Sequence, residues 1–211
     1  MKLAGLLMIE HRLIERMISV IDEEVDAIRA GKKADALFAD TVVEFMRIYA
    51  DKCHHGKEEN VLFRELQRKK ISAAHKRTMD ELVTEHAAGR EIVKGLALAG
   101  RYDGNRREGN LTGVIKGLER IVKFYPEHIE KEEKYFIVEV MNYFSGKEQD
   151  DMLNEFREYD RKLIHAKYQD VVGKMEKDHS SVLEHCQSSV TAEQDRFRAD
   201  DEPCDAGMTG K

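Results

Sequence analysis

Apolar residues recur every three or four positions along most of this chain, which is the spacing of amphipathic helices. The pattern predicts five helices, over residues 1–30, 35–69, 72–100, 111–144 and 147–177. Gly31 and Gly100 stand where the first and third helices should end, and Asp35 and Ser72 stand at positions suited to cap the second and third. The chain is therefore expected to consist mainly of long helices.

Two segments lack this pattern. Residues 101–110 include Gly104 and Gly109 and are predicted to form a loop. After Asp178 polar residues dominate, so the end of the chain is expected to be poorly ordered. The chain has only two prolines and no tryptophan, which also favours long helices over many short strands.

The predicted fold class is all-α: an up-down four-helix bundle with an additional C-terminal fifth helix and a flexible tail. Residues 1–146 are expected to form the bundle, residues 147–177 a helix packed on it, and residues 178–211 a polar, disordered tail. The short connections between the predicted helices favour antiparallel neighbours, which is why the up-down order is preferred.

Charge and hydropathy narrow the classes of partner. The formal net charge is −6, and acidic and basic residues are interspersed along the chain without an extended basic stripe, so nucleic acid is not expected to bind. The apolar run from Leu3 to Ile9 is too short to cross a membrane. Three cysteines give no framework of disulfide bridges, and a reducing cytoplasm is the expected location.

Two of the predicted helices carry the same motif, His-x-x-x-Glu, each time in a doubled form. The second helix contains His54 and His55 followed by Glu58 and Glu59, and the fourth contains His128 followed by Glu132 and Glu133. Residues four apart lie on one face of a helix, so each motif can present an imidazole and a carboxylate to the same point. Two such pairs on facing helices predict a site for two metal ions.

The apolar stripe of the second helix favours one of its two registers. His55 and Glu59 share a face with Ile48, Leu62 and Leu66, and we assign them as ligands on that ground. The other pair, His54 and Glu58, is expected on a flanking or solvated face.

The fourth helix leaves its register more open. Glu132 aligns with Ile121, Tyr125 and His128 and is preferred as the ligand. Glu133 is only one position round the helix, where it aligns with apolar residues, and it remains the alternative.

His11 and His86 lie within the apolar stripes of the first and third helices and complete the predicted set. Imidazole and carboxylate ligands suit iron, and also manganese or zinc. Apart from Cys53 no thiolate lies near the motifs, which disfavours an iron–sulfur cluster. Iron is therefore the expected metal.

The ordered set of these motifs resembles the hemerythrin-like, or HHE cation-binding, family over roughly residues 3–145. The resemblance implies two iron ions joined by an oxo or hydroxo bridge. It also implies a site that binds or reacts with a small ligand such as O2, NO or H2O2. The implied metal ligands are His11, His55, Glu59, His86, His128 and Glu132.

One position departs from the family. Oxygen-carrying hemerythrins have a second histidine on the third helix, four residues after the first, where this chain has Arg90. A ligand is then missing or is supplied from elsewhere, for which His165 of the fifth helix is the candidate. Arg90 and Tyr125 are predicted to act as hydrogen-bond donors beside the metals rather than as ligands.

The residues allow two classes of function. One is a di-iron oxidoreductase that reduces peroxide or nitric oxide in oxidative or nitrosative stress, which a missing ligand would favour. The alternative is a non-enzymatic module for oxygen or iron binding, or for sensing, in which the fifth helix or the tail contacts a protein partner. The sequence does not identify which small molecule binds.

Overall fold

The computed structural model describes residues 3–31, 35–100, 111–161 and 167–177, and this part of the chain contains helices and no strand. The longer α-helices are α1 (Leu3–Arg29), α2 (Ala36–Phe45), α4 (Ala73–Ala99), α5 (Leu111–Glu132) and α7 (Gly146–Asp160). Shorter elements continue α2 and α5: the π-helices η1 (Met46–His55), η2 (Glu58–Phe63) and η3 (Glu133–Ile137), the α-helices α3 (Arg64–Leu66) and α6 (Val138–Val140), and the 3-10 helix η4 (Met141–Tyr143). The all-α class predicted from the apolar spacing is confirmed.

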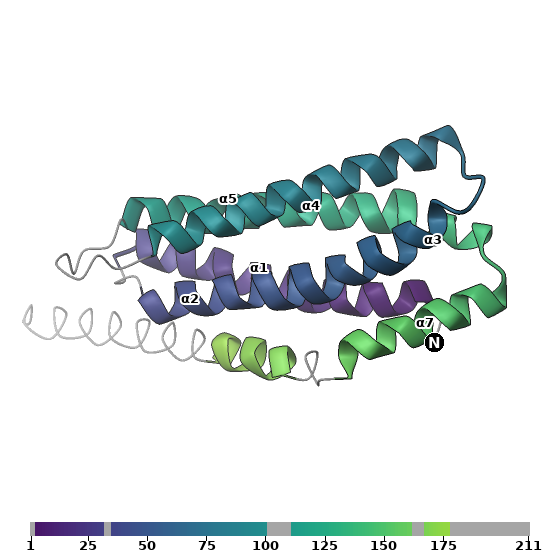
Figure 1. Ribbon diagram of the computed structural model, residues 1–211. Coiled ribbons are helices and arrows are strands. Elements are labelled where there is room, and N and C mark those ends of the chain that lie inside the picture. Colours follow the sequence, from purple (N-terminus) through teal and green to yellow (C-terminus); the bar gives the residue numbers. More distant parts are fainter. Residues whose placement is uncertain (1–2, 32–34, 101–110, 162–166, 178–211) are drawn as a thin grey trace, which may run out of the picture.

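The helices form an elongated bundle (Figure 1). α1, the path from α2 to α3, α4 and the path from α5 to η4 lie lengthwise beside one another, and α7 runs along the outside against α1 and η2. Residues 167–177 are also helical. The part of the chain described has no helix with the length and apolar character that a membrane span requires.

The residues predicted to cap or end helices lie at helix ends in the structure. The Asp35 side chain accepts a hydrogen bond of 2.9 Å from the backbone of Leu37, and the Ser72 side chain accepts one of 3.1 Å from His75. Gly31 follows α1 with a φ of 106°, a left-handed conformation that glycine adopts without strain.

The continuity of the helices differs from the prediction. The second predicted helix is interrupted by η1 and η2, and the fourth by η3. The predicted fifth helix begins with a capping box between Ser145 and Glu148, and α7 then ends at Asp160. Residues 162–166 between α7 and the final helical segment lie outside the described residues, as do the predicted loop at 101–110 and the predicted tail at 178–211.

The core consists of two apolar clusters. The first includes Ile14, Phe45, Tyr49, Leu96 and Ile121, and the second includes Leu7, Phe63, Leu82, Phe136 and Phe156 from α7. Between them on every long helical path lie buried polar residues: His11 on α1, His54 and His55 in η1, His86 on α4, and His128 and Glu132 on α5. We call this set, together with Glu58, the polar layer.

Candidate metal centre

Two successive histidines, His54 and His55, are buried at the end of the π-helix η1. Residues Cys53 to Glu58 are buried without interruption, which a helix with one apolar face cannot achieve. His54 faces α1, where its Nδ1 lies 2.9 Å from Glu10, and His55 faces α4, where its ring stacks on His86 with a centroid distance of 3.9 Å. η1 packs against α4 and α1, and η2 packs against α7, which makes the double burial possible.

The expectation that His54 and Glu58 occupy a flanking or solvated face is therefore wrong. Both are buried, whereas the Glu59 side chain is 26% exposed and forms an ion pair with Arg90. The prediction assumed a regular α-helix with a single buried face, and a π-helix changes the direction of each following side chain.

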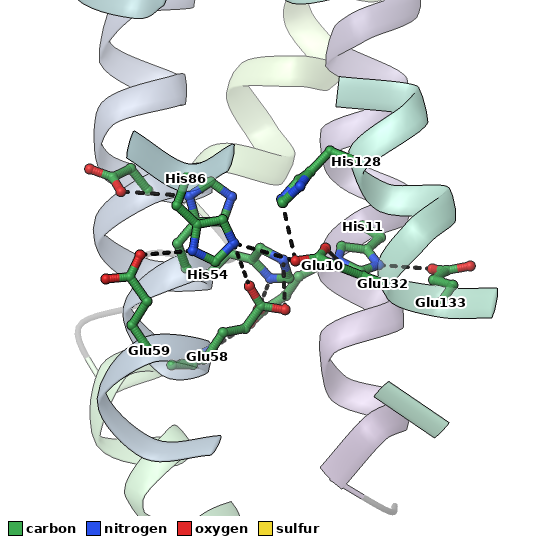
Figure 2. A network of polar contacts seen from close by, with 12 residues as sticks. Glu10, His11, His54, Glu58, Glu59, His86, His128, Glu132 and Glu133 are labelled. Carbon is green, nitrogen blue, oxygen red and sulfur yellow. Dashed lines mark hydrogen bonds and ion pairs between the residues drawn. The ribbon is translucent and has the colours of Figure 1, made fainter. Parts of the chain in front are cut away.

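The donors of the polar layer fall into two groups, each with ligand atoms within 4.8 Å of one another. The first group consists of His11, His54, Glu58 and Glu132, and the second consists of His55, His86 and His128. The elements α1, η1, η2, α4 and α5 all contribute to the layer, so distant parts of the chain meet at this point (Figure 2).

Glu58 and Glu132 span the two groups. Glu132 has one oxygen 3.2 Å from His11 Nε2 and the other 3.3 Å from His128 Nε2. Glu58 has one oxygen 3.7 Å from His54 Nε2 and the other 3.4 Å from His86 Nε2. Each carboxylate can thus offer one oxygen to a cation in either group, which is how a bridging carboxylate binds two metal ions.

Carboxylates outside the layer orient four of the histidines. Their Nδ1 atoms lie 2.7–2.9 Å from a carboxylate oxygen in the pairs His11–Glu133, His54–Glu10, His86–Glu59 and His128–Glu85. An ionised carboxylate only accepts hydrogen bonds, so each Nδ1 carries the proton. The Nε2 lone pair is then directed into the layer, as in metal sites where a carboxylate fixes the histidine tautomer.

A cation stands behind each of these carboxylates. The ion pairs are Arg12–Glu133, Lys57–Glu10, Arg90–Glu59 and Lys131–Glu85. The same order of cation, carboxylate and imidazole therefore occurs four times around the layer. His55 differs, because its Nδ1 lies 3.6 Å from Asp51 and has no hydrogen-bond partner among the described residues.

The histidine pKa values diverge strongly within the layer. Burial alone would lower the pKa of His11, but the carboxylates of Glu132 and Glu133 raise it to about 9. Burial and the charge of His11 lower the pKa of His54 to about 4, against the opposing effect of Glu10. Burial and the neighbouring His86 hold the pKa of His55 well below its ordinary value. Burial would lower the pKa of His86 too, but the carboxylates of Glu132 and Glu59 raise it. Without a metal ion, positive charge in the layer is thus favoured at His11 and His86.

The pKa values of the two buried carboxylates, Glu58 and Glu132, also differ strongly. Burial and the nearby charge of Glu132 raise the pKa of Glu58 well above its ordinary value. Burial would raise the pKa of Glu132 as well, but His128, His11 and His86 lower it well below the ordinary range. One negative charge is therefore favoured over two, which is the expected result when a buried carboxylate pair lacks a cation.

These observations fit a bound metal pair. His11 Nε2 and His54 Nε2 lie 2.9 Å apart and share a hydrogen bond in the absence of metal. The same separation is close to the roughly 3 Å between adjacent donors on an ion with bonds of about 2.1 Å. Both oxygens of Glu58, one of Glu132 and Nε2 of His128 are buried without a hydrogen-bond partner in the described part of the chain. Such atoms are costly to bury unless something satisfies them, and divalent cations would do so for all of them.

The sequence-predicted residues are largely brought together. His11, His55, His86, His128 and Glu132 all lie in the two groups, whereas Glu59 lies outside them. Glu133 turns away from the layer and accepts from His11 Nδ1. His165 lies outside the described residues.

The two residues predicted to donate hydrogen bonds lie beside the layer. The guanidinium of Arg90 donates to Glu59 and Asp51, each at 2.7 Å, and is not itself among the donors of the groups. Tyr125 is buried with its ring 6.4 Å from that of His55.

Sequence reasoning missed the placement of His54 and Glu58, and the carboxylates of Glu10 and Glu85. The doubled motif could have revealed His54 and Glu58. When a helix is buried on two sides, both histidines and both glutamates of such a motif can point into the protein. Glu10 and Glu85 stand directly before His11 and His86 in the sequence, but each orients a histidine more than 40 residues away along the chain, which no local pattern predicts.

Comparison with known proteins gave one match. Residues 3–140 match the family model described as the hemerythrin HHE cation-binding domain, which is more than half of the chain. The match includes every member of the polar layer and ends at α6, before α7. No curated protein and no solved structure matched.

Proposed function

The chain belongs to the hemerythrin HHE cation-binding family, and from that premise we propose that it holds two iron ions and binds a small ligand such as O2, NO or H2O2 at one of them. The observation that carries the proposal is the pair of donor groups spanned by Glu58 and Glu132. The nitrogen and oxygen donors suit iron, and Cys53 belongs to neither group. We also propose the up-down order of a four-helix bundle for residues 1–146, with residues 147–177 packed on it.

In this proposal one iron is held by His11 and His54 and the other by His55, His86 and His128. Glu58 and Glu132 would each offer an oxygen to both ions, and the family resemblance implies an oxo or hydroxo bridge between them. The histidine-rich group would thus supply five protein donors, close to the roughly six that iron takes with the bridge. The group of His11 and His54 would supply four, which would leave an open position for a small ligand at that iron.

His55 takes the role of the histidine that Arg90 replaces. The chain offers five buried imidazoles despite the missing histidine on α4, because η1 turns both His54 and His55 inward. A reactive site was expected from a missing ligand, whereas in this proposal His55 supplies that ligand. A single open position favours binding over turnover.

The chain's own residues prepare the site in three ways. Glu10, Glu59, Glu85 and Glu133 hold the Nδ1 protons of four histidines, so that Nε2 remains free for a metal. The burial of the ligands excludes bulk water and large substrates. Iron supplies the redox chemistry and the affinity for the diatomic or peroxide ligand.

Reduction of peroxide or nitric oxide is the second candidate, in oxidative or nitrosative stress. Tyr125 favours it, because its buried side chain brings a hydroxyl, which can donate a hydrogen bond, beside the histidine-rich group, with the ring 6.4 Å from that of His55. A hydrogen-bond donor at this place could orient a bound peroxide or nitric oxide for reduction.

Mixing experiments with the iron(II)-loaded protein test the proposal. We expect about two irons per chain, and a stoichiometric, reversible spectral change on mixing with O2 or NO in stopped flow. Repeated consumption of peroxide or NO beyond one equivalent would favour the second candidate. A chain that retains no tightly bound iron after reconstitution would overturn both.

A further inference from the structure

Lys57 is a completely buried lysine next to the polar layer. Its side chain has no exposed surface, and its ammonium group forms ion pairs with Glu10 and, at 2.6 Å, with Asp160. The ring of Phe156 lies 5.8 Å from the same nitrogen. Burying an ammonium group is costly unless its partners remain in place. Asp160 and Phe156 both belong to α7, so the ion pair depends on how α7 packs.

Lys57 is also one of the four cations that stand behind the histidines. The other three, Arg12, Arg90 and Lys131, have side chains that are 54%, 40% and 32% exposed, so water can replace their partners. Lys57 and Glu10 are both buried, and the link continues one step further to Asp160, whose side chain is 27% exposed, giving the order Asp160, Lys57, Glu10 and His54. The family match ends at residue 140, so Asp160 lies beyond it.

The cluster of Glu10, Cys53 and Asp160 is not itself a metal site. Its ligand atoms lie close enough to hold a cation, but Lys57 already places an ammonium group between the two carboxylates. A second cation would have to displace a positive charge that cannot reach water. This cluster therefore acts through the groups that it holds in position and does not bind a metal ion.

We propose that Lys57 and Asp160 are positioning residues that couple the packing of α7 to metal binding at the His11–His54 group. The proposal rests on the proposed function, because it assumes a metal ion at His54. A cation on Nε2 makes the Nδ1–H of His54 a stronger donor, which strengthens its bond to Glu10. Glu10 then holds Lys57, and Lys57 holds Asp160 and the end of α7.

This coupling is reciprocal, because two binding events that share one network change each other's free energy by the same amount. Metal binding should make the end of α7 more stable, and disruption of the α7 contact should weaken metal binding. The iron proposed to have the open position is the one that α7 reaches. A partner that pulled α7 away would thus alter the ligand-binding iron rather than the filled one.

The first experiment measures how fast iron leaves the loaded full-length protein when a chelator is added. Lys57→Met removes the ammonium group and should speed the loss of one iron by roughly 10–100-fold, the usual effect of a change behind a metal ligand. Asp160→Asn should speed it about 5-fold or more. Asp151→Asn is the matched control, since this aspartate of α7 is exposed and forms an ion pair with Lys147 of the same helix. Its rate should equal that of the wild type.

The second experiment measures amide hydrogen exchange in α7 with and without iron. In the wild type we expect iron to slow exchange near Asp160 more than in a reference segment of α4 around Ile92. In Asp160→Asn this extra slowing should be lost. If the role of Asp160 were purely structural, Asp160→Asn would raise exchange equally with and without iron, and the effect of iron would stay unchanged.

The outcomes separate the two proposals. A wild-type chain that binds no iron overturns the proposed function and the coupling with it. If iron binds but Asp160→Asn matches the Asp151→Asn control in both experiments, only the coupling is overturned. Should Lys57→Met fail to fold, as judged by circular dichroism, the comparison of the two aspartate variants decides alone.

Discussion

Glu58 and Glu59 are neighbours in the sequence, but they have different electrostatic surroundings. Glu58 faces a histidine of each donor group, His54 and His86, and burial and the nearby charge of Glu132 raise its pKa. Burial alone would raise the pKa of Glu59 too, yet His86 and Arg90 lower it. The first carboxylate is suited to bridge metal ions, and the second to hold His86 in its orientation.

Substitution of these two glutamates should therefore have unequal effects on iron content. Glu58→Gln replaces a bridging carboxylate by a neutral amide and should leave roughly one iron per chain or less. Glu59→Gln should retain both irons at high iron concentration, with affinity reduced about 10–100-fold. Iron analysis after gel filtration measures both. The opposite ranking would restore the register that the apolar stripe of the sequence favours.

The role given to His55 can be tested by rescue. His55→Ala should lose roughly one iron, because the second group keeps only two imidazoles. Arg90→His places an imidazole one helical turn after His86, where the oxygen carriers have theirs. The double variant His55→Ala with Arg90→His should recover iron content, measured by the same analysis. If His55→Ala retains as much iron as the wild type, His55 is not a ligand.

Among the elements, the positions of helices followed from sequence but their internal geometry did not. The apolar stripe of α1 and the caps Asp35 and Ser72 are local features, and they were predicted correctly. The π-helical turn η1 depends on packing from two sides, and periodicity arguments assume one buried face. The carboxylates behind the histidines depend on contacts between distant segments, which no local pattern reveals.

Close packing of α4 against α5 predicts opposite effects at two glycines. A Cβ added at Gly117 would lie 3.2 Å from the backbone Cα of Leu96, which cannot move without moving α4. Gly117→Ala should lower the free energy of unfolding by about 1–3 kcal/mol. Gly95→Ala is the control, because nothing lies within 4 Å of its added Cβ. It should raise stability by up to about 1 kcal/mol. Urea denaturation of both variants checks the contrast.

The first turn of α7 should respond to pH through Glu148. Lys69 and the hydrogen bonds from Ser145 lower the pKa of this carboxyl from 4.5 to about 2. Because the folded-state pKa is lowered, its contribution is fully present above pH 4.5 and is lost as the pH falls through 2. Glu148→Gln should melt at a lower temperature than the wild type at pH 6. The difference should shrink as the pH is lowered toward 2, and a constant difference would contradict the assignment.

At the scale of the whole molecule, the polar layer divides the bundle into two apolar halves. The first cluster includes Tyr168 from the last helical segment, and the second includes Phe156 from α7. Each half is closed by its own apolar contacts, whereas the layer between them holds imidazoles and carboxylates. How firmly the two halves are held together therefore depends on whether the buried imidazoles and carboxylates of the layer have binding partners.

Removal of iron should weaken the layer more than the two halves. Iron at about 100 times its dissociation constant contributes about 2.7 kcal/mol per site, which corresponds to a rise in melting temperature of roughly 5–10 °C for a chain of this size. In the metal-free protein the nearby carboxylates favour positive charge on His11 and His86, which substitutes in part for the cations.

We therefore expect amide exchange to rise first around His54, His86 and His128 when iron is removed, while both clusters keep most of their protection. Hydrogen-exchange mass spectrometry of the two states, with calorimetry on the same samples, measures both effects. Uniform loss of protection over the whole bundle would mean that the layer and the clusters unfold as one unit. An unchanged melting temperature would show that the donor groups do not hold metal in the folded protein, because a cation bound only to the folded state must stabilise it.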